Sequence, residues 1–350
     1  MIIQNTTRPL VSIVVPCYNA ERTIDSCLGS LYSQRFLGLE IICVDDGSTD
    51  CTADILREMQ LTHPELVVVR QQNSGAWIAR LTGIRIAKGD YIMFLDSDDA
   101  AAPGFIDKMY TAISNAGSDL VVCGFNRVDA DSGALMSSEF CEPLEPFVFN
   151  DDPGKILQVN PAPWNKIYRA SLLGSVNELS VAPVMFDDLC LLLIALLHSD
   201  VCISYLPEAL VEYKVHEDST INSMNALQLE DAVRAMIEIR SQYADSSRIE
   251  ILEAFDSVAF AHIGVSMSFR ILGSNSENTS NVIDSLIAVL DREFPLWRSS
   301  RYLRMSYGLE NGGIFIKAAI ASAFVKFGLF KPALVAYRFA KKAIGKDISW

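Results

Sequence analysis

Three carboxylates follow an apolar run in the segment YIMFLDSDD, residues 91–99. The apolar run predicts a buried strand, and acids are costly inside one, so they must emerge at its end. In an open α/β sheet, ligands bind at this carboxyl edge of the strands. Side chains alternate along extended backbone, which predicts that Asp96 and Asp98 point to one side and Ser97 to the other. Two converging carboxylates repel each other, and a divalent cation holding a substrate phosphate would neutralise them.

A second pair of acids, Asp45 and Asp46, also ends an apolar run. If the two runs form neighbouring parallel strands, Asp45 and Asp46 join Asp96 and Asp98 on one rim of the sheet. Like charges gathered on one edge are destabilising without a ligand, which favours a functional site for the combined clusters. Turn and helix-cap chemistry explains Asp46 and Asp50 equally well when each is taken alone.

A third pair, Asp187 and Asp188, opens an apolar helical pattern that runs to His198. One of these acids suits the helix N-cap, and the other could face the cleft as a general base. The residue types alone do not divide the two roles.

The elements that would position these acids alternate regularly over the first hundred residues. Predicted strands cover residues 11–15, 39–44, 66–69 and 91–95, and predicted helices cover residues 20–34, 49–61 and 74–87. This alternation predicts a doubly wound, mostly parallel α/β sheet with right-handed crossovers. Polar residues at 46–50 and 73–75 supply candidate helix caps.

Later elements are less regular and divide the chain further. We expect a helix at 105–115, a strand at 120–123, loops and a hairpin at 126–163, a helix at 187–198, strands at 201–205 and 209–215, and helices from 225 onward with breaks at 245–247, 273–279 and 312–313. The predicted organisation is an α/β half at 1–105, a second half at 106–222 and a helical region at 223–350.

Composition narrows the class of protein. The 350 residues carry a net charge of −14, which argues against a general nucleic-acid binder. The eight cysteines have no CxxC spacing, so we expect buried free thiols rather than zinc ligands or disulfides. The N-terminus has neither a basic n-region nor an apolar h-region before the first strand, which predicts a cytoplasmic protein.

The last segment, residues 312–350, has seven basic side chains and one acid. Its apolar part is interrupted by Lys317 and Lys326, so a transmembrane span is not expected. Basic side chains further along share a helix face, which suits docking at the inner face of the cell membrane. A packed helical cap with a solvated basic face is the alternative.

Several motifs together carry a resemblance to family 2 glycosyltransferases of the GT-A-type fold. They are VSIVVPCYNAERTIDSCLGSL, EIICVDDGSTD, NSGAWIARLTGIRIAKGDYIMFLDSDD, PWNKIYRASLL, FDDL and YKVHEDST, in the order and spacing of that family. The resemblance covers about residues 10–222. It implies that 1–105 is the nucleotide-sugar-binding half and 106–222 the acceptor-binding half of the GT-A domain, followed by the helical region 223–350 with its basic amphipathic tail. It implies an inverting, metal-dependent transfer of a sugar from a nucleotide-sugar, with a UDP-sugar favoured, to a hydroxyl of a polysaccharide or glycolipid acceptor in cell-surface glycan synthesis.

On the donor side, the resemblance implies that Pro16 and Tyr18 border the nucleotide base. Asp45 would accept a hydrogen bond from the base, as an ionised carboxylate can from the N3–H of uracil. Arg80 would lie near the nucleotide or its phosphates. Asp46 and Ser97 would complete the donor site.

On the catalytic side, Asp96 and Asp98 match the family's D-x-D element, with Asp98 as a ligand of Mn²⁺ or Mg²⁺. His216 falls where a loop closes over the diphosphate and would contact the metal or a phosphate. Asp188 matches the acid that deprotonates the acceptor hydroxyl. This chain has Asp187 where the family has Glu, which leaves the choice of base between Asp187 and Asp188 open.

One difference from the family pattern lies beside Arg80, and two other families fit the acidic motif less well. Leu81 replaces a common Asn after Arg80, which removes one polar contact near the nucleotide. A haloacid-dehalogenase-type phosphatase would need Thr or Val at the position of Ala100, and an EF-hand would need Gly at the position of Ala101. A catalytically degenerate scaffold in a polysaccharide assembly complex stays open.

Overall fold

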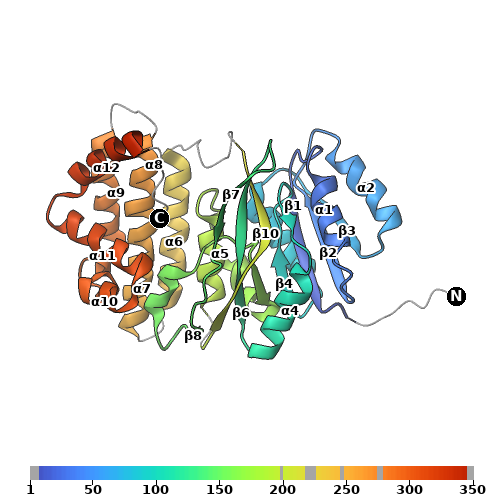
Figure 1. The fold of residues 1–350 in the computed structure, drawn as a ribbon, viewed down its shortest axis with the longest axis horizontal. Helices are drawn as coiled ribbons and strands as arrows, with labels where there is room; N and C mark the ends of the chain where they lie inside the picture. Colours follow the sequence, from blue (N-terminus) through green and yellow to red (C-terminus); the bar gives the residue numbers. More distant parts are fainter. Residues whose placement is uncertain (1–7, 198–199, 217–225, 245–247, 274–278, 345–350) are drawn as a thin grey trace. The chain divides into compact units, whose positions relative to one another are not determined.

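The chain forms two compact units in the computed structural model. The described residues are 8–197, 200–216, 226–244, 248–273 and 279–344. Unit 1 comprises Met1–Phe149 and Pro161–Ile239, and unit 2 comprises Asn150–Asn160 and Arg240–Trp350. Figure 1 shows the strands of unit 1 side by side and the helices of unit 2.

One sheet organises unit 1, with strand order β3-β2-β1-β4-β9-β6-β10-β5. Its strands are β1 (Val11–Cys17), β2 (Leu39–Asp45), β3 (Leu66–Arg70), β4 (Tyr91–Phe94), β5 (Ala100–Ala101), β6 (Leu120–Asp129), β9 (Lys166–Arg169) and β10 (Cys202–Val215), with β7 (Leu135–Glu139) on β6 and β8 (Phe147–Val148) on β10. Strands β1 to β4 are mutually parallel, and β9 runs antiparallel to both β4 and β6. Strands β4, β6 and β10 therefore end at the same edge of the sheet, and the predicted mostly parallel α/β sheet is confirmed.

Helices follow the strands of unit 1 as the alternating pattern predicts. They are α1 (Ile24–Tyr32), α2 (Thr52–Thr62), α3 (Gly75–Ile86), α4 (Phe105–Ala116) and α5 (Asp187–Ala195), with the 3₁₀ segment η2 (Ala170–Glu178) before α5. Strand β1 lies inside the sheet and is buried on both faces, which is why its sequence, VSIVVPC, is apolar apart from Ser12 instead of alternating.

Three predictions about the strands are wrong in detail. Strand β6 extends to Asp129, six residues beyond its predicted end. The two strands predicted at 201–205 and 209–215 are the single strand β10, whose pairing is irregular between Leu206 and Val211 because Pro207 has no N–H to donate. Strands β2 and β4 are not neighbours, since β1 pairs with both, so their terminal acids are separated by one strand.

The loops after β1 and β2 are joined by hydrogen bonds. The backbone N–H of Ala20 donates to Oγ1 of Thr52 at 2.8 Å, and the N–H of Glu21 donates to Oδ2 of Asp50 at 3.1 Å. The side chain of Glu21 in turn accepts from the N–H of Cys51 at 3.0 Å. All eight cysteines are free thiols, and Cys51 is the one that is fully exposed.

Unit 2 is helical, as predicted for the chain after residue 225. It contains η1 (Pro153–Gln158), α7 (Ile249–Ala259), the π-helix η4 (Phe260–Ser266), α8 (Met267–Gly273), α9 (Thr279–Glu293), η5 (Pro295–Arg298), η6 (Arg301–Leu303), α10 (Met305–Asn311), α11 (Gly313–Lys326) and α12 (Phe330–Ile344), and α6 (Ala226–Ala244) leads into it from unit 1. The predicted break at 312–313 is confirmed by Gly312, and the break at 245–247 and most of that at 273–279 lie outside the described residues.

Two buried contacts hold unit 2 together. The indole of Trp297 stacks on Phe260, with ring centroids 4.6 Å apart. The carboxylate of Asp256 is fully buried and accepts two hydrogen bonds from Arg240, at 2.6 and 3.0 Å. No helix in the described part of the chain is long and apolar enough to cross a membrane.

Candidate active site

Arg80 lies at the centre of a cluster of carboxylates and is itself buried. Its Nη1 donates to Oδ2 of Asp187 at 2.5 Å and lies 3.0 Å from Oδ1 of Asp188. Its Nη2 donates to Oδ1 of Asp96 at 2.9 Å. One guanidinium therefore brings together acids that are about ninety residues apart in the sequence, from the end of β4 and the start of α5.

Local structure explains how Arg80 reaches the edge of the sheet. It is carried by α3, which packs closely on β1 at Gly83. A Cβ at Gly83 would lie only 2.3 Å from Cγ1 of Val14, which shows how close the helix and the strand are. Helix α5 begins directly after Phe186, whose φ of 60° is left-handed. That conformation is strained for a bulky residue, and it turns the chain so that Asp187 and Asp188 occupy the first helical turn.

The acids of α5 are perturbed in the direction expected of a general base. Burial and the neighbouring charge of Asp187 raise the pKa of Asp188 above the ordinary range of a carboxyl group, although Arg80 acts in the opposite direction. Burial likewise raises the pKa of Asp187. Atom Oδ1 of Asp188 is buried and accepts no hydrogen bond, while 34% of the side chain is exposed. Asp188 therefore combines solvent access with a raised proton affinity.

The chain after β4 turns instead of continuing as a strand. The N–H of Asp99 donates to the carbonyl of Asp96 at 3.0 Å, which closes a tight turn. The predicted alternation of Asp96, Ser97 and Asp98 is therefore wrong: Asp96 contacts Arg80, whereas Asp98 faces a different partner. The third acid, Asp99, is fully buried and accepts from the backbone N–H of Lys214 at 2.9 Å, which ties this turn to β10.

Asp98 and His216 form the candidate metal site. Oδ2 of Asp98 lies 3.5 Å from Nε2 of His216, and both side chains are partly exposed. Burial and the charge of Asp96 raise the pKa of Asp98, so a cation would relieve a real electrostatic cost at this position. The described residues contain no group of three or more metal-ligating side chains. Two protein ligands fit Mn²⁺ or Mg²⁺ when substrate phosphates and water supply the others.

The nucleotide-base end of the predicted site lies at the ends of β1 and β2. Pro16 is in β1 opposite Val44, and Tyr18 follows β1 with half of its side chain exposed. Asp45 is buried and accepts from the N–H of Ser48 at 2.9 Å. Its other oxygen accepts no hydrogen bond, although Nε of Arg70 lies 3.3 Å away. This free oxygen can accept a hydrogen bond from a ligand.

Asp46 has a different environment from Asp45. Its two oxygens accept from Nε2 of Gln71 and from the backbone N–H groups of Ser74 and Gly75, at 2.8 to 2.9 Å. Asp46 thus caps the N-terminus of α3 from a distant strand. The prediction that polar side chains at 73–75 cap this helix is wrong, since Ser74 makes no side-chain cap hydrogen bond.

Sequence reasoning missed Lys166 beside the acid cluster. Its Nζ is buried and donates to the carbonyl of Ala162 at 2.5 Å and to Oδ1 of Asn165 at 2.8 Å. Burial lowers the pKa of Lys166 to about 7, even though Asp188 favours its charged form. The hydroxyl of Tyr168 is also buried and makes no hydrogen bond. The PWNKIYR motif contains both residues, but its letters alone do not say which side chains turn inward.

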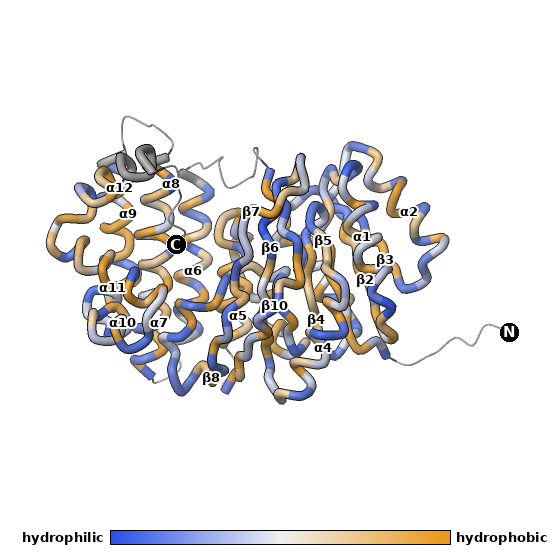
Figure 2. The backbone as a smooth tube through the Cα atoms, viewed as in Figure 1, coloured by the Kyte–Doolittle hydropathy of each residue, from blue (hydrophilic) through white to orange (hydrophobic). Residues whose placement is uncertain are grey.

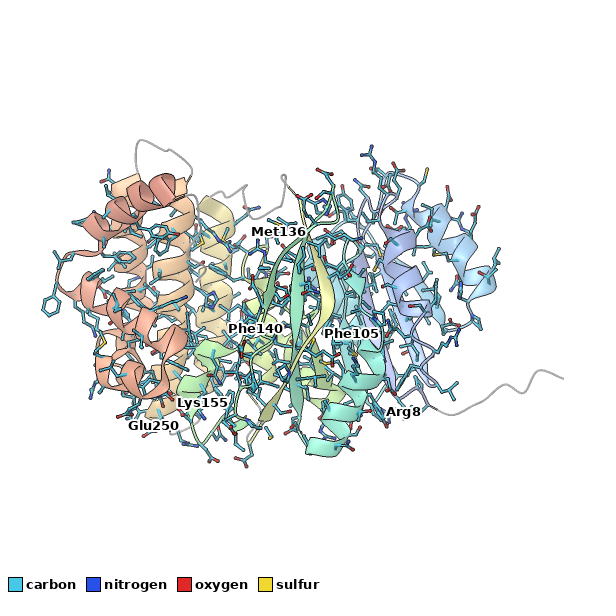
Figure 3. All side chains as sticks on the ribbon, in the orientation of Figure 1. Arg8, Phe105, Met136, Phe140, Lys155 and Glu250 are labelled. Atoms are coloured by element: carbon cyan, nitrogen blue, oxygen red, sulfur yellow. The ribbon has the colours of Figure 1, made fainter. Side chains whose placement is uncertain are left out.

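A cavity of about 280 Å³ lies at the ends of β6 and β10, on the same edge of the sheet as the acid cluster. It is lined by Asn126, Val128, Asp129, Ala130, Gly133, Leu135, Glu212 and Lys214. Lys214 links it to Asp99 through the backbone hydrogen bond described above. Figure 3 labels Met136 in the exposed strand β7, one residue beyond the lining residue Leu135.

Comparison with known proteins covers a part of the chain that contains some of the residues of this site. The model of the glycosyl transferase family 2 matches residues 12–176. Residues 12–176 are a family 2 glycosyltransferase domain. The glycosyltransferase domain contains Arg80, the turn after β4 and Lys166, while α5 and His216 follow it.

Relatives of the glycosyltransferase domain include "Putative glycosyltransferase EpsH" of Bacillus subtilis, 35% identical over 170 residues, which are 47% of this chain and 48% of that protein. A second relative is "Poly(ribitol-phosphate) beta-glucosyltransferase" of Bacillus spizizenii, 35% identical over 167 residues, or 47% of this chain and 25% of that protein. The match thus spans half or less of these relatives. The crystal structure of S. aureus TarS 1–349 in complex with UDP-GlcNAc has the same fold, with a TM-score of 0.68 at 20% identity over 95% of this chain and 92% of that chain.

Proposed function

We propose that this chain is an inverting, metal-dependent glycosyltransferase. It transfers a sugar from a nucleotide-sugar to a hydroxyl of a cell-surface polysaccharide or glycolipid. The observation that carries the proposal is the cluster around Arg80, in which the candidate base Asp188 lies beside Asp96 of the D-x-D element. A buried, raised-pKa carboxylate with partial solvent access suits general-base chemistry.

The donor nucleotide is bound at the ends of β1 and β2. The free oxygen of Asp45 accepts the N3–H of uracil, and Tyr18 packs against the base. UDP-sugars are the first donors to test, because TarS, which has this fold, was crystallised with UDP-GlcNAc. Asp98 and His216 would hold the metal, which would stabilise the negative charge that develops on the leaving diphosphate.

The acceptor hydroxyl loses its proton to Asp188. Arg80 positions this carboxylate by holding Asp187 and Asp188 together through one nitrogen. Attack from the face of the sugar opposite the diphosphate inverts the anomeric centre. The cavity lined by Asn126, Glu212 and Lys214 supports an acceptor subsite in the half 106–222, because its amide and charged groups match sugar hydroxyls.

A donor-hydrolysis screen tests the proposal. The purified chain is incubated with Mn²⁺ and UDP-, GDP- and dTDP-sugars, and nucleotide release is followed. We expect release from a UDP-sugar, abolished by Asp98→Ala and reduced about 10²–10⁴-fold by Asp188→Ala, which removes the base. The exposed acid Asp54 supplies the control variant Asp54→Ala. Absence of both nucleotide release and calorimetric UDP binding would contradict the proposal.

A further inference from the structure

An exposed apolar patch lies at the end of α11, and we call it the α11 tip: Ile320, Phe324, Phe327 and Leu329. Ile320, Phe324 and Phe327 recur at helical spacing, so they lie along one face of the helix. Phe327 is 77% exposed and Leu329 is 52% exposed, in the turn that joins α11 to α12. Figure 2 colours most of α11 as hydrophobic. Exposed apolar side chains gathered in this way are typical of an interaction surface.

Cations accompany the α11 tip. Lys326 precedes Phe327 directly, and its Nζ lies 5.9 Å from the ring centroid of Trp297. Burial and the charges of Arg298 and Arg304 lower the pKa of Lys326, so these basic groups act on one another. In the part of the chain that the structure describes, neither Lys326 nor Arg304 forms a salt bridge. Positive charge beside exposed apolar side chains thus has no internal counter-ion here.

We propose that the α11 tip inserts into the interface of an anionic lipid bilayer. Phe327 and Leu329 enter the boundary between headgroups and acyl chains, while Lys326 and Arg304 contact anionic headgroups. This inference does not depend on the proposed function. It gives the basic C-terminal segment a specific contact that sequence alone did not reveal.

Charge distinguishes a bilayer from a second copy of the chain as the occupant. In a two-fold interface the same patch would face itself, so the cations of both copies would repel each other. The protein carries a net charge of −14, whereas residues 312–350 hold seven basic side chains and one acid. An anionic surface therefore attracts this end of the molecule and repels the rest, which orients the contact.

Vesicle flotation with the full chain tests the proposal. The probes are vesicles of phosphatidylcholine alone and of phosphatidylcholine mixed with phosphatidylglycerol. We expect flotation with the anionic vesicles, weakened by high salt, which screens the headgroup attraction. The double variant Phe327→Ser/Leu329→Ser should lower the partition coefficient at least about tenfold, because it removes the inserted apolar groups. The charge variant Lys326→Glu should also reduce flotation, but only with anionic vesicles.

Matched controls keep the test decisive. Leu37 and Leu61 are 89% and 84% exposed in unit 1, so Leu37→Ser/Leu61→Ser removes comparable apolar surface elsewhere and should float like the parent chain. Circular dichroism and a thermal melt check that each variant is folded. Equal flotation of the parent and the Phe327→Ser/Leu329→Ser variant overturns the proposal. Failure of the parent chain to float also overturns the proposal. If sedimentation then finds a dimer of the parent chain that the Phe327→Ser/Leu329→Ser variant dissociates, the α11 tip is an interface between two copies instead.

Discussion

Arg80 is the residue on which the geometry of the candidate base depends. It is the single cation in direct contact with Asp96, Asp187 and Asp188 among the described residues. Atom Nη1 of Arg80 contacts both acids of α5. A small displacement of the Arg80 side chain therefore moves Asp188 relative to the turn that carries the D-x-D element. Arg80 thus contacts carboxylates, whereas the resemblance predicts a position near the nucleotide or its phosphates.

Replacing Arg80 by Lys should lower kcat more than it raises the KM for donor. Lys keeps the charge but cannot bridge three carboxylates with a planar fork, so the base is held less accurately. We expect a loss of about 10²-fold in kcat, of the size that a misplaced catalytic group produces. Steady-state kinetics of nucleotide release measures the split. Arg85→Lys, on the exposed side of the same helix, is the control, and an equal loss in both variants would contradict the role of Arg80.

The raised pKa of Asp188 should appear in the pH profile. The base acts only when deprotonated, so kcat/KM should increase about tenfold per pH unit on its acid side. Because burial and Asp187 raise this pKa, the acid limb should lie well above pH ~4, where an ordinary aspartate titrates. A profile that is flat from about pH 5 to 8 would exclude a base with a raised pKa.

The sequence predicts the strands and helices of unit 1 well where a segment has one clear periodicity. The central strand β1 and helix α3 are predicted within two residues. The misses have physical causes outside the local pattern. Asp46 caps helix α3, which starts twenty-nine residues later, and the N–H of Asp99 closes the turn after β4. Neither contact leaves a periodic pattern in the sequence. The left-handed Phe186 that starts α5 carries no composition cue, because that conformation usually marks glycine.

Replacing Asp46 by Ala should destabilise α3 and the fold around it. Three accepted hydrogen bonds are lost, two of them from the first N–H groups of the helix. We expect a decrease of about 1–3 kcal/mol in the free energy of unfolding, measured by denaturant titration. Asp54→Ala, which removes an exposed acid, is the control.

The conservative variant Asp46→Asn separates capping from nucleotide binding. It retains an oxygen acceptor, so it should keep most of the stability. If Asp46 only caps α3, calorimetric UDP binding should be unchanged in this variant. A folded Asp46→Asn protein that has lost UDP affinity would return Asp46 to the donor site.

For the whole molecule, the two units have separate sources of stability. Unit 1 is built on one sheet with a hydrophobic core, whereas unit 2 is helical and holds the pair of Arg240 and the buried Asp256. The sequence predicted the helical character of the second half from its periodicity. It did not predict the pair of Arg240 and Asp256, because these residues lie on different helices and each alone resembles a surface charge.

Replacing Arg240 by Ala should destabilise unit 2 strongly. The change leaves the carboxylate of Asp256 buried without its cation, for an expected loss of about 3–5 kcal/mol in denaturant unfolding. Exposed Arg292, paired with Glu293, provides the control Arg292→Ala, with about 0–1 kcal/mol.

The loss in Arg240→Ala should shrink as the pH falls. Burial already raises the pKa of Asp256, and without Arg240 that pKa rises further. A raised pKa in the folded state means that protonation favours folding, so stability is gained as the pH falls from neutral towards the unfolded pKa of ~4. A pH-independent difference between variant and parent would show that the ion pair is not the cause.

The exposed thiol of Cys51 offers a place for a fluorescent reporter. Cys51 directly precedes α2, in the loop that hydrogen bonds join to the loop after β1, and its side chain is exposed. Its hydrogen bond to Glu21 raises the pKa of the thiol, so alkylation by a maleimide dye should be slow at neutral pH and faster under mildly alkaline conditions. The other thiols are at least partly buried, so the dye should label Cys51 without removal of any native cysteine. A dye at this position would then report the binding of a nucleotide.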